Sequence, residues 1–405
     1  MKEGLIRAEM IRQRVSDMKT VNICPVASSG TSEDVIQDYC NRLSLLLPDT
    51  GICWSACPPD AILFTTGGTE QKAVNLLREQ NPVLLLAFEE RNAFASACEV
   101  KAYLDHAGRK TRLINLSDPQ DIARLADPDQ TLIRLNSFLN SRIGIVGTES
   151  EWLIHSVPDP AILKERFGID LIRLSWDQFP DSAQWPESDD FNTVFASSLT
   201  DQVKVHGRVF GLLHQIVHEN RLDGITVECF PMVMQDRITA CPALALLNQE
   251  GIPAASEGDL VSLVGMLLCK SLTGKIPWMA NLSGIKNDQV HLSHCTVPFN
   301  LVSDYRFDTH YETGQGIAVC GTFYPGEYTL LRLSSDFRHA FVAEGSLIHH
   351  DPITESCRTQ AVIKLPADRF SSLKNNPLGN HHLLLRGNFK DLLRTALINL
   401  NFTII

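Results

Sequence analysis

Apolar and amphipathic segments alternate along the first third of the chain. Four short apolar runs have the length and composition of buried strands, and they cover residues 21–27, 61–68, 82–88 and 111–116. The segments 33–47 and 93–107 instead carry apolar residues at helical spacing. Continuous apolar strands that alternate with amphipathic helices indicate a parallel sheet covered by helices on both faces. We therefore expect an α/β domain over residues 1–141.

The same alternation starts again after a short interval. The runs 143–147 and 224–230 have the character of buried strands, and the segments 204–220 and 241–250 have the character of helices. We expect a second α/β domain over residues 142–254. Both domains are expected to be parallel sheets of the Rossmann or flavodoxin-like kind. In such open sheets, ligands bind at the carboxyl ends of the strands.

The pattern changes near Gln289. Short runs in which apolar and polar residues alternate follow one another, at 290–297, 316–323, 328–333 and 360–365. Alternation with turn residues in between is typical of antiparallel strands. We therefore expect a C-terminal domain over residues 255–405 that is mostly antiparallel β and barrel-like, with an apolar helix at its start.

Charge and composition narrow the classes of partner. The 405 residues carry a formal net charge of -11, which argues against nucleic acid or an anionic membrane as the main partner. No apolar run approaches the roughly 20 residues of a membrane-spanning helix, and the charged residues 1–14 lack the apolar segment of a secretory signal. The eleven cysteines are scattered without a C-x-x-C pair. A reduced, cytoplasmic setting is expected.

Acidic residues follow two successive strands. Glu228 comes at the end of one strand, and Glu257 and Asp259 come at the end of the next. Consecutive strands are usually neighbours, so these carboxylates are expected to converge around a hard divalent cation such as Mg²⁺ or Mn²⁺. The stretch S-E-G-D is also a capping box, with Ser256 as N-cap and Asp259 three residues into the helix. From spacing alone, both interpretations stay open.

Histidines are concentrated late in the chain. His291 and His294 face opposite sides if their segment is a strand, and we favour His294 for a site because it lies nearest the strand end. His381 and His382 alternate in the same way. A lone histidine is more often a structural hydrogen-bonding residue, but two carboxylates with a histidine form a recurrent metal site.

One glycine turn has a different character. The stretch T-T-G-G-T-E at 65–70 joins an apolar run to a helix, and helix N-termini suit anions. It is neither G-x-G-x-x-G nor a Walker loop, so it does not by itself indicate a nucleotide. The chain also lacks G-x-S-x-G and H-E-x-x-H.

Several longer stretches carry a family resemblance. The run C-P-A-L-A-L-L-N-Q-E-G-I-P-A-A-S-E-G-D-L, the stretch H-L-S-H-C and the C-terminal G-N-H-H-L-L-L-R-G resemble the L-fucose isomerase-like family, which is related to the L-fucose and L-arabinose ketol isomerases. The resemblance implies two α/β domains and a β-barrel-like domain. It also implies a metal site of two acids and a histidine, here Glu228, Asp259 and His381. Glu257 and His294 then become substrate-binding residues.

The resemblance also implies an activity. Family members are aldose–ketose isomerases, which are intramolecular oxidoreductases, and they use Mn²⁺ or another divalent cation such as Mg²⁺ or Co²⁺. A proton moves between C1 and C2 of the sugar through a cis-enediol, with the metal polarising the carbonyl. Glu228 and Asp259 then serve both as ligands and as acid–base groups. The family further implies a homo-oligomer, with a hexamer as the expected size.

The substrate is less defined than the reaction. The chain is much shorter than typical L-fucose isomerases, and their aldose-contacting residues have no clear counterparts in it. The resemblance to short members of this group implies a deoxy or sulfonated hexose, such as sulfoquinovose. The main alternative is a non-catalytic sugar-binding or regulatory protein on the same fold, which needs no metal site. A metal-dependent hydrolase or aldolase shares the metal site and differs only in its products.

Overall fold

The chain forms two units, one up to Leu139 and the other from Asn140 onward. The computed structural model describes the following residues: 20–47, 51–54, 59–77, 83–107, 109, 111–125, 134–135, 137–198, 200–349 and 351–405. The charged N-terminal segment that we expected to lack a secretory signal lies outside the described residues.

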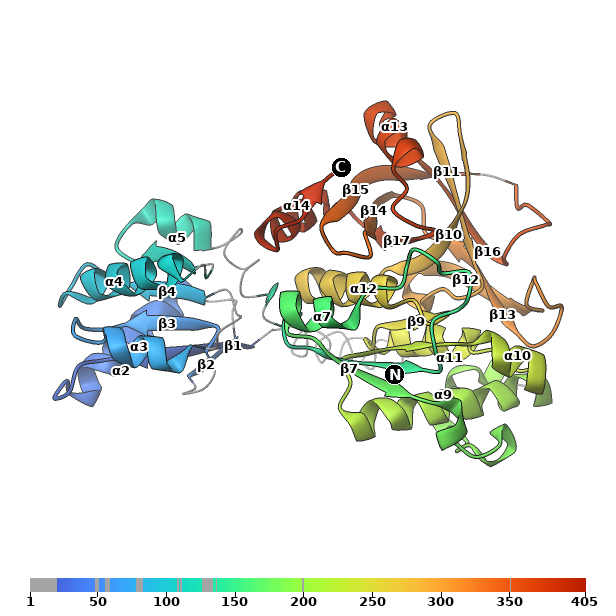
Figure 1. Ribbon diagram of the computed structural model, residues 1–405, viewed down its shortest axis with the longest axis horizontal. Helices are drawn as coiled ribbons and strands as arrows, with labels where there is room; N and C mark the ends of the chain where they lie inside the picture. Colours follow the sequence, from blue (N-terminus) through green and yellow to red (C-terminus); the bar gives the residue numbers. More distant parts are fainter. Residues whose placement is uncertain are drawn as a thin grey trace, which may run out of the picture. The chain divides into compact units, whose positions relative to one another are not determined.

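The first unit is a five-stranded parallel sheet in the order β2-β1-β3-β4-β5 (Figure 1). Its strands are β1 (Thr20–Val26), β2 (Gly51–Trp54), β3 (Ala61–Phe64), β4 (Val83–Ala87) and β5 (Thr111–Asn115). Its helices are α2 (Glu33–Leu46), α3 (Glu70–Leu76), α4 (Ala93–His106) and α5 (Pro119–Leu125). Leu63 belongs to one apolar core with Leu43 of α2, and Phe64 belongs to another with Val100 of α4. Neighbouring residues of β3 thus point to opposite faces, and helices cover both, as the continuous apolar runs predicted.

The second unit begins with a four-stranded parallel sheet in the order β7-β6-β8-β9. The strands are β6 (Arg142–Val146), β7 (Asp170–Leu174), β8 (Gly224–Val227) and β9 (Ala254–Ser256). The helices are α7 (Pro160–Phe167), α8 (Asp189–Val194), α9 (Asp201–Asn220), α10 (Phe230–Asp236), α11 (Cys241–Gln249) and α12 (Leu260–Thr273). Short 3-10 helices lie at η1 (Trp176–Gln178), η2 (Ser182–Gln184) and η3 (Ala196–Ser198). A domain boundary after residue 254 cuts β9, because this whole strand pairs with β8.

A six-stranded antiparallel barrel completes the second unit. The order β14-β17-β10-β11-β16-β15 closes on itself through a pairing of β14 with β15, and β18 adds to β15. The strands are β10 (Trp278–Lys286), β11 (Gln289–His294), β14 (Glu327–Leu333), β15 (His339–Ile348), β16 (Thr359–Lys364), β17 (His381–Arg386) and β18 (Thr403–Ile404). A separate ribbon of β12 (Val302–Asp308) and β13 (Ala318–Phe323) follows η4 (Phe299–Leu301), and the last helices are α13 (Ala367–Asn375) and α14 (Lys390–Asn399). The expected fold class, parallel α/β sheets followed by an antiparallel barrel, is confirmed.

The helix α12 is apolar all round because it is enclosed on all sides. Every residue from Leu260 to Cys269 is buried, and α12 packs against β8 and β9 of the sheet and against β14 and β17 of the barrel (Figure 1). A Cβ on Gly265 would lie 2.5 Å from a methyl carbon of Leu383, so the helix approaches β17 closely. The start of α12 is therefore fixed against both layers. None of the helices in the described ranges is long and apolar enough to cross a bilayer.

Candidate metal centre

Three chain segments meet at the carboxyl edge of the second parallel sheet. The Oε2 atom of Glu228, after β8, accepts a hydrogen bond of 2.8 Å from the backbone N–H of Thr148, after β6. The N–H of Ser150 donates to the carbonyl of Glu257, after β9, at 3.0 Å. The two acidic strand ends that the sequence indicated therefore lie along one edge, joined by the 147–150 loop. Ligands bind at this edge in sheets of this kind.

The turn between β9 and α12 needs an unusual backbone. Glu257 has a φ of 62° and Gly258 a φ of 70°, which are left-handed conformations that favour glycine. A Cβ on Gly258 would lie 2.4 Å from the carbonyl oxygen of Thr148, so only glycine fits there. From this turn the Glu257 carboxylate reaches His294 and His381, at 3.3 and 3.5 Å. Left-handed non-glycine residues are frequent at functional sites.

Asp259, not Ser256, caps α12. The Oδ1 atom of Asp259 accepts a hydrogen bond of 2.7 Å from the N–H of Ser262, three residues into the helix. The expected capping box, with Ser256 as N-cap and Asp259 at the third helical position, is therefore wrong. Ser256 is the last residue of β9, and the two left-handed residues after it delay the helix until Leu260.

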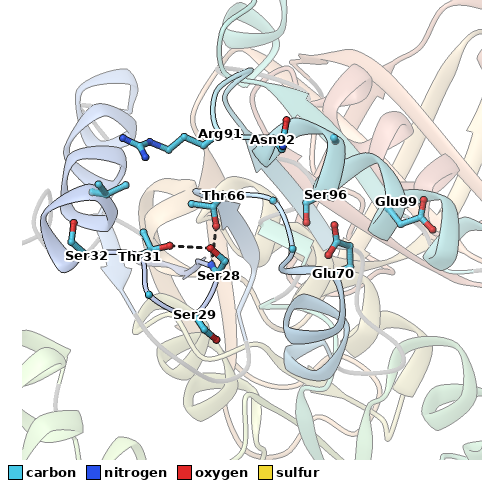
Figure 2. A pocket seen from close by; sticks show the side chains of 15 residues that line it. Ser28, Ser29, Thr31, Ser32, Thr66, Glu70, Arg91, Asn92, Ser96 and Glu99 are labelled. Carbon is cyan, nitrogen blue, oxygen red and sulfur yellow. Dashed lines mark hydrogen bonds between the residues drawn. The ribbon is translucent and has the colours of Figure 1, made fainter.

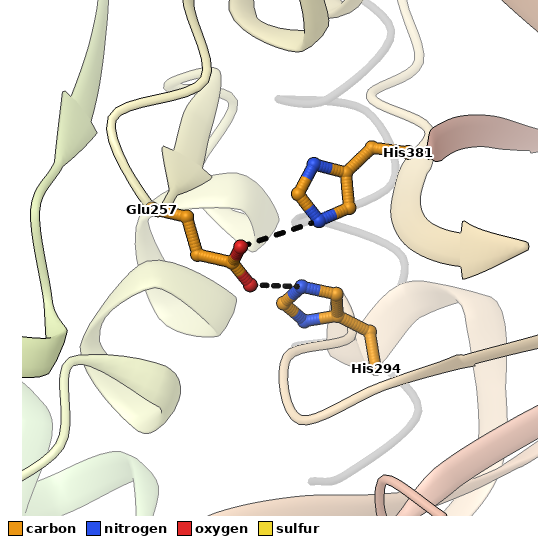
Figure 3. Close-up of side chains that lie close together, drawn as sticks. All are labelled: Glu257, His294 and His381. Carbon is orange, nitrogen blue, oxygen red and sulfur yellow. Dashed lines mark ion pairs between the residues drawn. The ribbon is translucent and has the colours of Figure 1, made fainter. Parts of the chain in front are cut away.

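A carboxylate and two imidazoles converge beside this turn (Figure 3). The Oε1 atom of Glu257 lies 3.3 Å from Nε2 of His294, and its Oε2 atom lies 3.5 Å from Nε2 of His381. All three residues are buried, and their ligand atoms lie within 4.8 Å of one another. Strand register brings the end of β11 and the start of β17 to the same part of the barrel, because Asn281 of β10 pairs with Ser293 on one side and with His381 on the other. We call Glu257, His294 and His381 the metal-ligand group.

The geometry of this group fits a cation. Divalent metals bind carboxylate and imidazole atoms at about 2.0–2.2 Å, so two ligands at right angles lie about 3 Å apart. The distances from Glu257 to the two imidazoles are close to that value. In addition, Nε2 of His381 is buried and has no hydrogen-bond partner in the part of the chain that the structure describes. Buried polar atoms without a hydrogen bond are rare, and a metal ion held between this nitrogen and Glu257 Oε2, 3.5 Å away, would supply a bond to it.

Further residues orient the ligands from behind. Nδ1 of His381 lies 2.8 Å from Oδ2 of Asp259, and Nδ1 of His294 lies 3.2 Å from Oγ1 of Thr296. Metal-binding histidines usually donate their other ring N–H to such a partner, which fixes the tautomer and the ring orientation. The indole N–H of Trp152 donates to Oε2 of Glu257 at 2.6 Å.

Opposite charges in the group stabilise one another. Burial alone would raise the pKa of Glu257, but His381 and His294 outweigh burial and hold this pKa well below its ordinary value. Burial alone would lower the pKa of His381, but Glu257 and Asp259 outweigh burial and raise it to about 9. Without a cation, His381 therefore holds a proton that balances two buried carboxylates. A cation would take the place of that proton.

The residues that converge are not the three that we expected to bind the metal. We expected Glu228, Asp259 and His381 as ligands, but the group that the structure brings together is Glu257, His294 and His381. Both oxygens of Asp259 are already engaged, one by the N–H of Ser262 and the other by the Ser262 hydroxyl and His381. Spacing could not show which acid of E-G-D lies between His294 and His381, because that depends on the left-handed turn. Glu228 stays half-buried at the neighbouring strand end.

The sequence interpretation missed a buried arginine. Arg332 of β14 is 1% exposed, and its Nη1 atom lies 3.7 Å from Oδ2 of Asp259. Its Nη2 atom donates to Oγ of Ser156 at 2.6 Å, and a Cβ on Gly379 would lie 2.3 Å from the same nitrogen. The signal was present in Y-T-L-L-R-L, where an arginine interrupts an apolar strand. Arg332 supports Asp259, which in turn orients His381.

Aromatic rings border the metal-ligand group. The ring of Trp152 is packed edge-on against Phe230 at 4.8 Å, and Phe230 contacts His310 at 5.6 Å. Trp152 is 48% exposed although its indole reaches the buried Glu257. It therefore lies between solvent and the metal-ligand group.

Comparison with known proteins assigns no family. The chain matches no protein-family model, and no curated protein is similar to it in sequence. The resemblance to L-fucose isomerase-like proteins therefore stays a prediction, and function is argued from the residues of the site.

Proposed function

We propose that this chain is a metal-dependent isomerase that interconverts an aldose and a ketose. One observation carries the proposal: a buried carboxylate and two buried imidazoles converge beside a sheet edge that holds a further acid, Glu228. The metal-ligand group would hold the cation, and Glu228 would supply the acid–base group that isomerisation needs. A protein that only binds a sugar needs neither. The strand order of the first unit, β2-β1-β3-β4-β5, is the flavodoxin-like order, which supports the expected fold kinship.

The ligand atoms of the metal-ligand group influence which cation it would bind. One carboxylate and two imidazoles suit a first-row transition ion better than Mg²⁺, which prefers oxygen ligands. Mn²⁺, which the family resemblance implies, is our first choice, and Co²⁺ is the second. Such an ion, when bound, polarises the sugar carbonyl and orients the adjacent hydroxyl group.

The protein's own groups would divide the remaining tasks. Glu228 would take the proton from C2 of the aldose and return it to C1, while the hydroxyl proton on O2 passes to O1. Asp259 would keep His381 in the tautomer whose Nε2 is free to bind metal. Trp152 would offer an apolar face to the carbon chain of the sugar. A deoxy or sulfonated hexose, such as sulfoquinovose, is the substrate class to screen first.

The three side chains of the metal-ligand group also favour a second function. Two histidines and one carboxylate with open positions also hold Fe²⁺ in oxygen-activating enzymes. That reaction consumes O₂ and needs no acid–base residue at the position of Glu228. Isomerisation is redox-neutral overall, so oxygen uptake separates the two functions directly.

Elemental analysis combined with a turnover assay tests the proposal. We expect about one Mn²⁺ or similar ion per wild-type chain, its loss in Glu257→Gln and His381→Gln, and its retention in Glu228→Gln. A screen of aldoses and sulfonated aldoses should give ketose with the wild type and none with Glu228→Gln. A wild-type protein that binds no metal even after Mn²⁺ is added would contradict the enzyme and leave a sugar-binding protein.

A further inference from the structure

The first unit contains a large cavity that the proposed reaction does not use. It has a volume of about 910 Å³ and lies between the loops that follow β1, β3 and β4. This volume is near the upper end of the range for small-molecule sites, about 300–1,000 Å³. Six of its lining side chains carry hydroxyl groups (Figure 2): Ser28, Ser29, Thr31, Ser32, Thr66 and Ser96.

The cavity lies where the topology of the sheet reverses. From β1 the chain passes through α2 to β2 on one side, whereas from β3 it passes to β4 on the other side. The loops after β1 and β3 therefore diverge and leave a crevice at the carboxyl edge. Open parallel sheets bind their ligands in this crevice. The glycine turn T-T-G-G-T-E forms one of its walls.

The walls of the cavity are held in place by hydrogen bonds between the loops. The N–H of Ser28 donates to Oγ1 of Thr66 at 2.8 Å, and the hydroxyls of Ser28 and Thr31 lie 3.1 Å apart. The N–H of Gly67 donates to the carbonyl of Arg91 at 2.8 Å. All three loops are thus connected without a ligand, and a preformed cavity reduces the entropic cost of binding.

One side of the cavity suits an oxyanion. Among the described lining residues Arg91 is the only arginine or lysine, and its guanidinium makes no hydrogen bond or ion pair within the described part of the chain. Figure 2 shows it on the same side as Thr31 and Ser32. The Ser32 side chain precedes α2 but does not cap it, so N–H groups of the first turn stay available. Together these groups offer a cation, hydroxyls and backbone donors to one anionic group.

The opposite side of the cavity suits hydroxyl groups. Glu70, Ser96 and Glu99 lie there (Figure 2). The pKa of Glu70 is held below its ordinary value, first by its own backbone N–H and then by Ser96 and Gly68. An ionised carboxylate only accepts hydrogen bonds, so this wall would repel a second anionic group and accept hydroxyl donors. The two sides therefore match the two ends of a ligand that is anionic at one end and hydroxylated at the other.

We propose that this cavity binds a hydroxylated small molecule with a single oxyanion group, a chemistry shared by sugar phosphates and sulfonated sugars. The oxyanion binds beside Arg91, and the hydroxyls bind toward Glu70 and Glu99. The site consists only of residues from the first unit, so it is distinct from the metal-ligand group. The inference goes beyond the proposed isomerase function and does not depend on it.

Calorimetric titration of the full chain tests the site. The probes are glucose 6-phosphate, sulfoquinovose, glucose and inorganic phosphate. We expect saturable binding of one or both anionic sugars, about tenfold or more tighter than that of glucose or of phosphate. Whether the phosphate or the sulfonate binds identifies the source of the oxyanion. Equal affinity for inorganic phosphate would overturn the hydroxylated ligand, and no saturable heat with any probe would overturn the site.

Three variants locate the binding within the chain. Arg91→Gln should weaken the anionic sugars about tenfold or more, whereas Arg112→Gln, a matched charge removal outside the cavity, should not. Glu257→Gln disables the metal-ligand group and should leave this binding intact. Binding that persists in Arg91→Gln, or that is lost in Glu257→Gln, would overturn the assignment to this cavity. Circular dichroism on each variant confirms that it is folded. Glu99→Gln, on the other wall, is a further independent variant. It should weaken the binding of the anionic sugars but not the binding of inorganic phosphate.

Discussion

The Nδ1 atom of His381 lies 2.8 Å from Oδ2 of Asp259, and both side chains are fully buried. This contact links the start of α12 to the first residue of β17. Asp259 also caps α12 through the N–H of Ser262 and lies 3.7 Å from the guanidinium of Arg332. A single carboxylate therefore anchors a helix, balances a buried cation and orients a candidate metal ligand.

Asp259→Asn separates the capping role from the charge. Asparagine is as good an N-cap as aspartate, so α12 should keep its start. Arg332 would lose its nearest buried anion, and His381 would lose the acceptor that fixes its tautomer. We expect metal affinity to fall about 10- to 100-fold and the free energy of unfolding to fall by about 3 kcal/mol, measured by metal titration and urea denaturation.

Ser262→Ala is the matched control for that variant. It removes the hydroxyl that donates to Oδ2 of Asp259 at 2.8 Å, but it leaves the carboxylate charge and the backbone cap in place. Metal affinity should therefore change by less than in Asp259→Asn. Equal losses in both variants would mean that the Asp259 charge does not act on His381.

Metal binding should depend on pH through His381. Its pKa in the folded protein without metal is about 9, raised by Glu257 and Asp259 against the effect of burial. Below pH 9 a cation must displace this proton, so apparent affinity should fall by up to about tenfold for each unit of pH. Chelator-buffered titrations between about pH 6.5 and 9 measure the slope. A flat profile would show that His381 is not a ligand.

The raised pKa of His381 also affects the stability of the metal-free protein. Because the pKa of His381 is higher in the folded chain than in the unfolded chain, the bound proton stabilises the fold. This contribution is complete below the unfolded pKa of about 6.5, and it is lost as the pH rises through the folded pKa of about 9. Urea denaturation with a chelator present should therefore show falling stability across that window. His381→Gln should remove this decline, and a decline of equal size in that variant would assign it to another group.

The fold was largely predictable because buried strands and helices have recognisable patterns of apolar residues. The residues of β3 are buried on both faces, and their run A-I-L-F is continuously apolar, as a covered parallel strand requires. Barrel closure could not be predicted in the same way. It rests on the pairing of β14 with β15, from Glu327 with Ser346 to Leu333 with Ala340, and alternation indicates strands without specifying their partners.

The site was predictable in its residues and less so in their roles. The strand ends indicated Glu257 and His294, which lie in the converging group, because parallel and barrel strands present their ends to a common crevice. The role of Glu228 stays a prediction. Which carboxylate joins the two histidines depends on the left-handed backbone of Glu257. A left-handed conformation can be expected from sequence only where the residue is glycine. Arg332 comes from a strand far along the chain, and only the fold brings it to Asp259.

His206 should make the second unit sensitive to acid. Its Nε2 accepts hydrogen bonds from the N–H groups of Thr239 and Ile317, so the ring must be neutral on that side. Burial lowers its pKa to about 4. Neutral His206 makes its full contribution to stability above its unfolded pKa of about 6.5. The free energy of unfolding should fall by about 3 kcal/mol as the pH drops from there toward 4. Urea denaturation at several pH values measures this loss.

His206→Gln should flatten that part of the pH profile while lowering stability at neutral pH. His218→Gln, on the exposed side of the same helix, is the matched control, and its stability should still fall as the pH drops toward 4. An acid sensitivity that survives in His206→Gln would have to come from other groups.

Gly258→Ala should disturb the metal-ligand group without touching any ligand. The substitution puts a Cβ at 2.4 Å from the carbonyl oxygen of Thr148 and also adds left-handed strain of about 1 kcal/mol. Because the 147–150 loop must move, Glu257 should shift relative to His294 and His381, and metal affinity should fall. Gly251→Ala is the control, since Gly251 has a similar φ of 87° and a Cβ added there would meet no atom within 4 Å. It should lose about 1 kcal/mol of stability and keep full metal affinity, so equal affinities in the two variants would contradict the role of this turn.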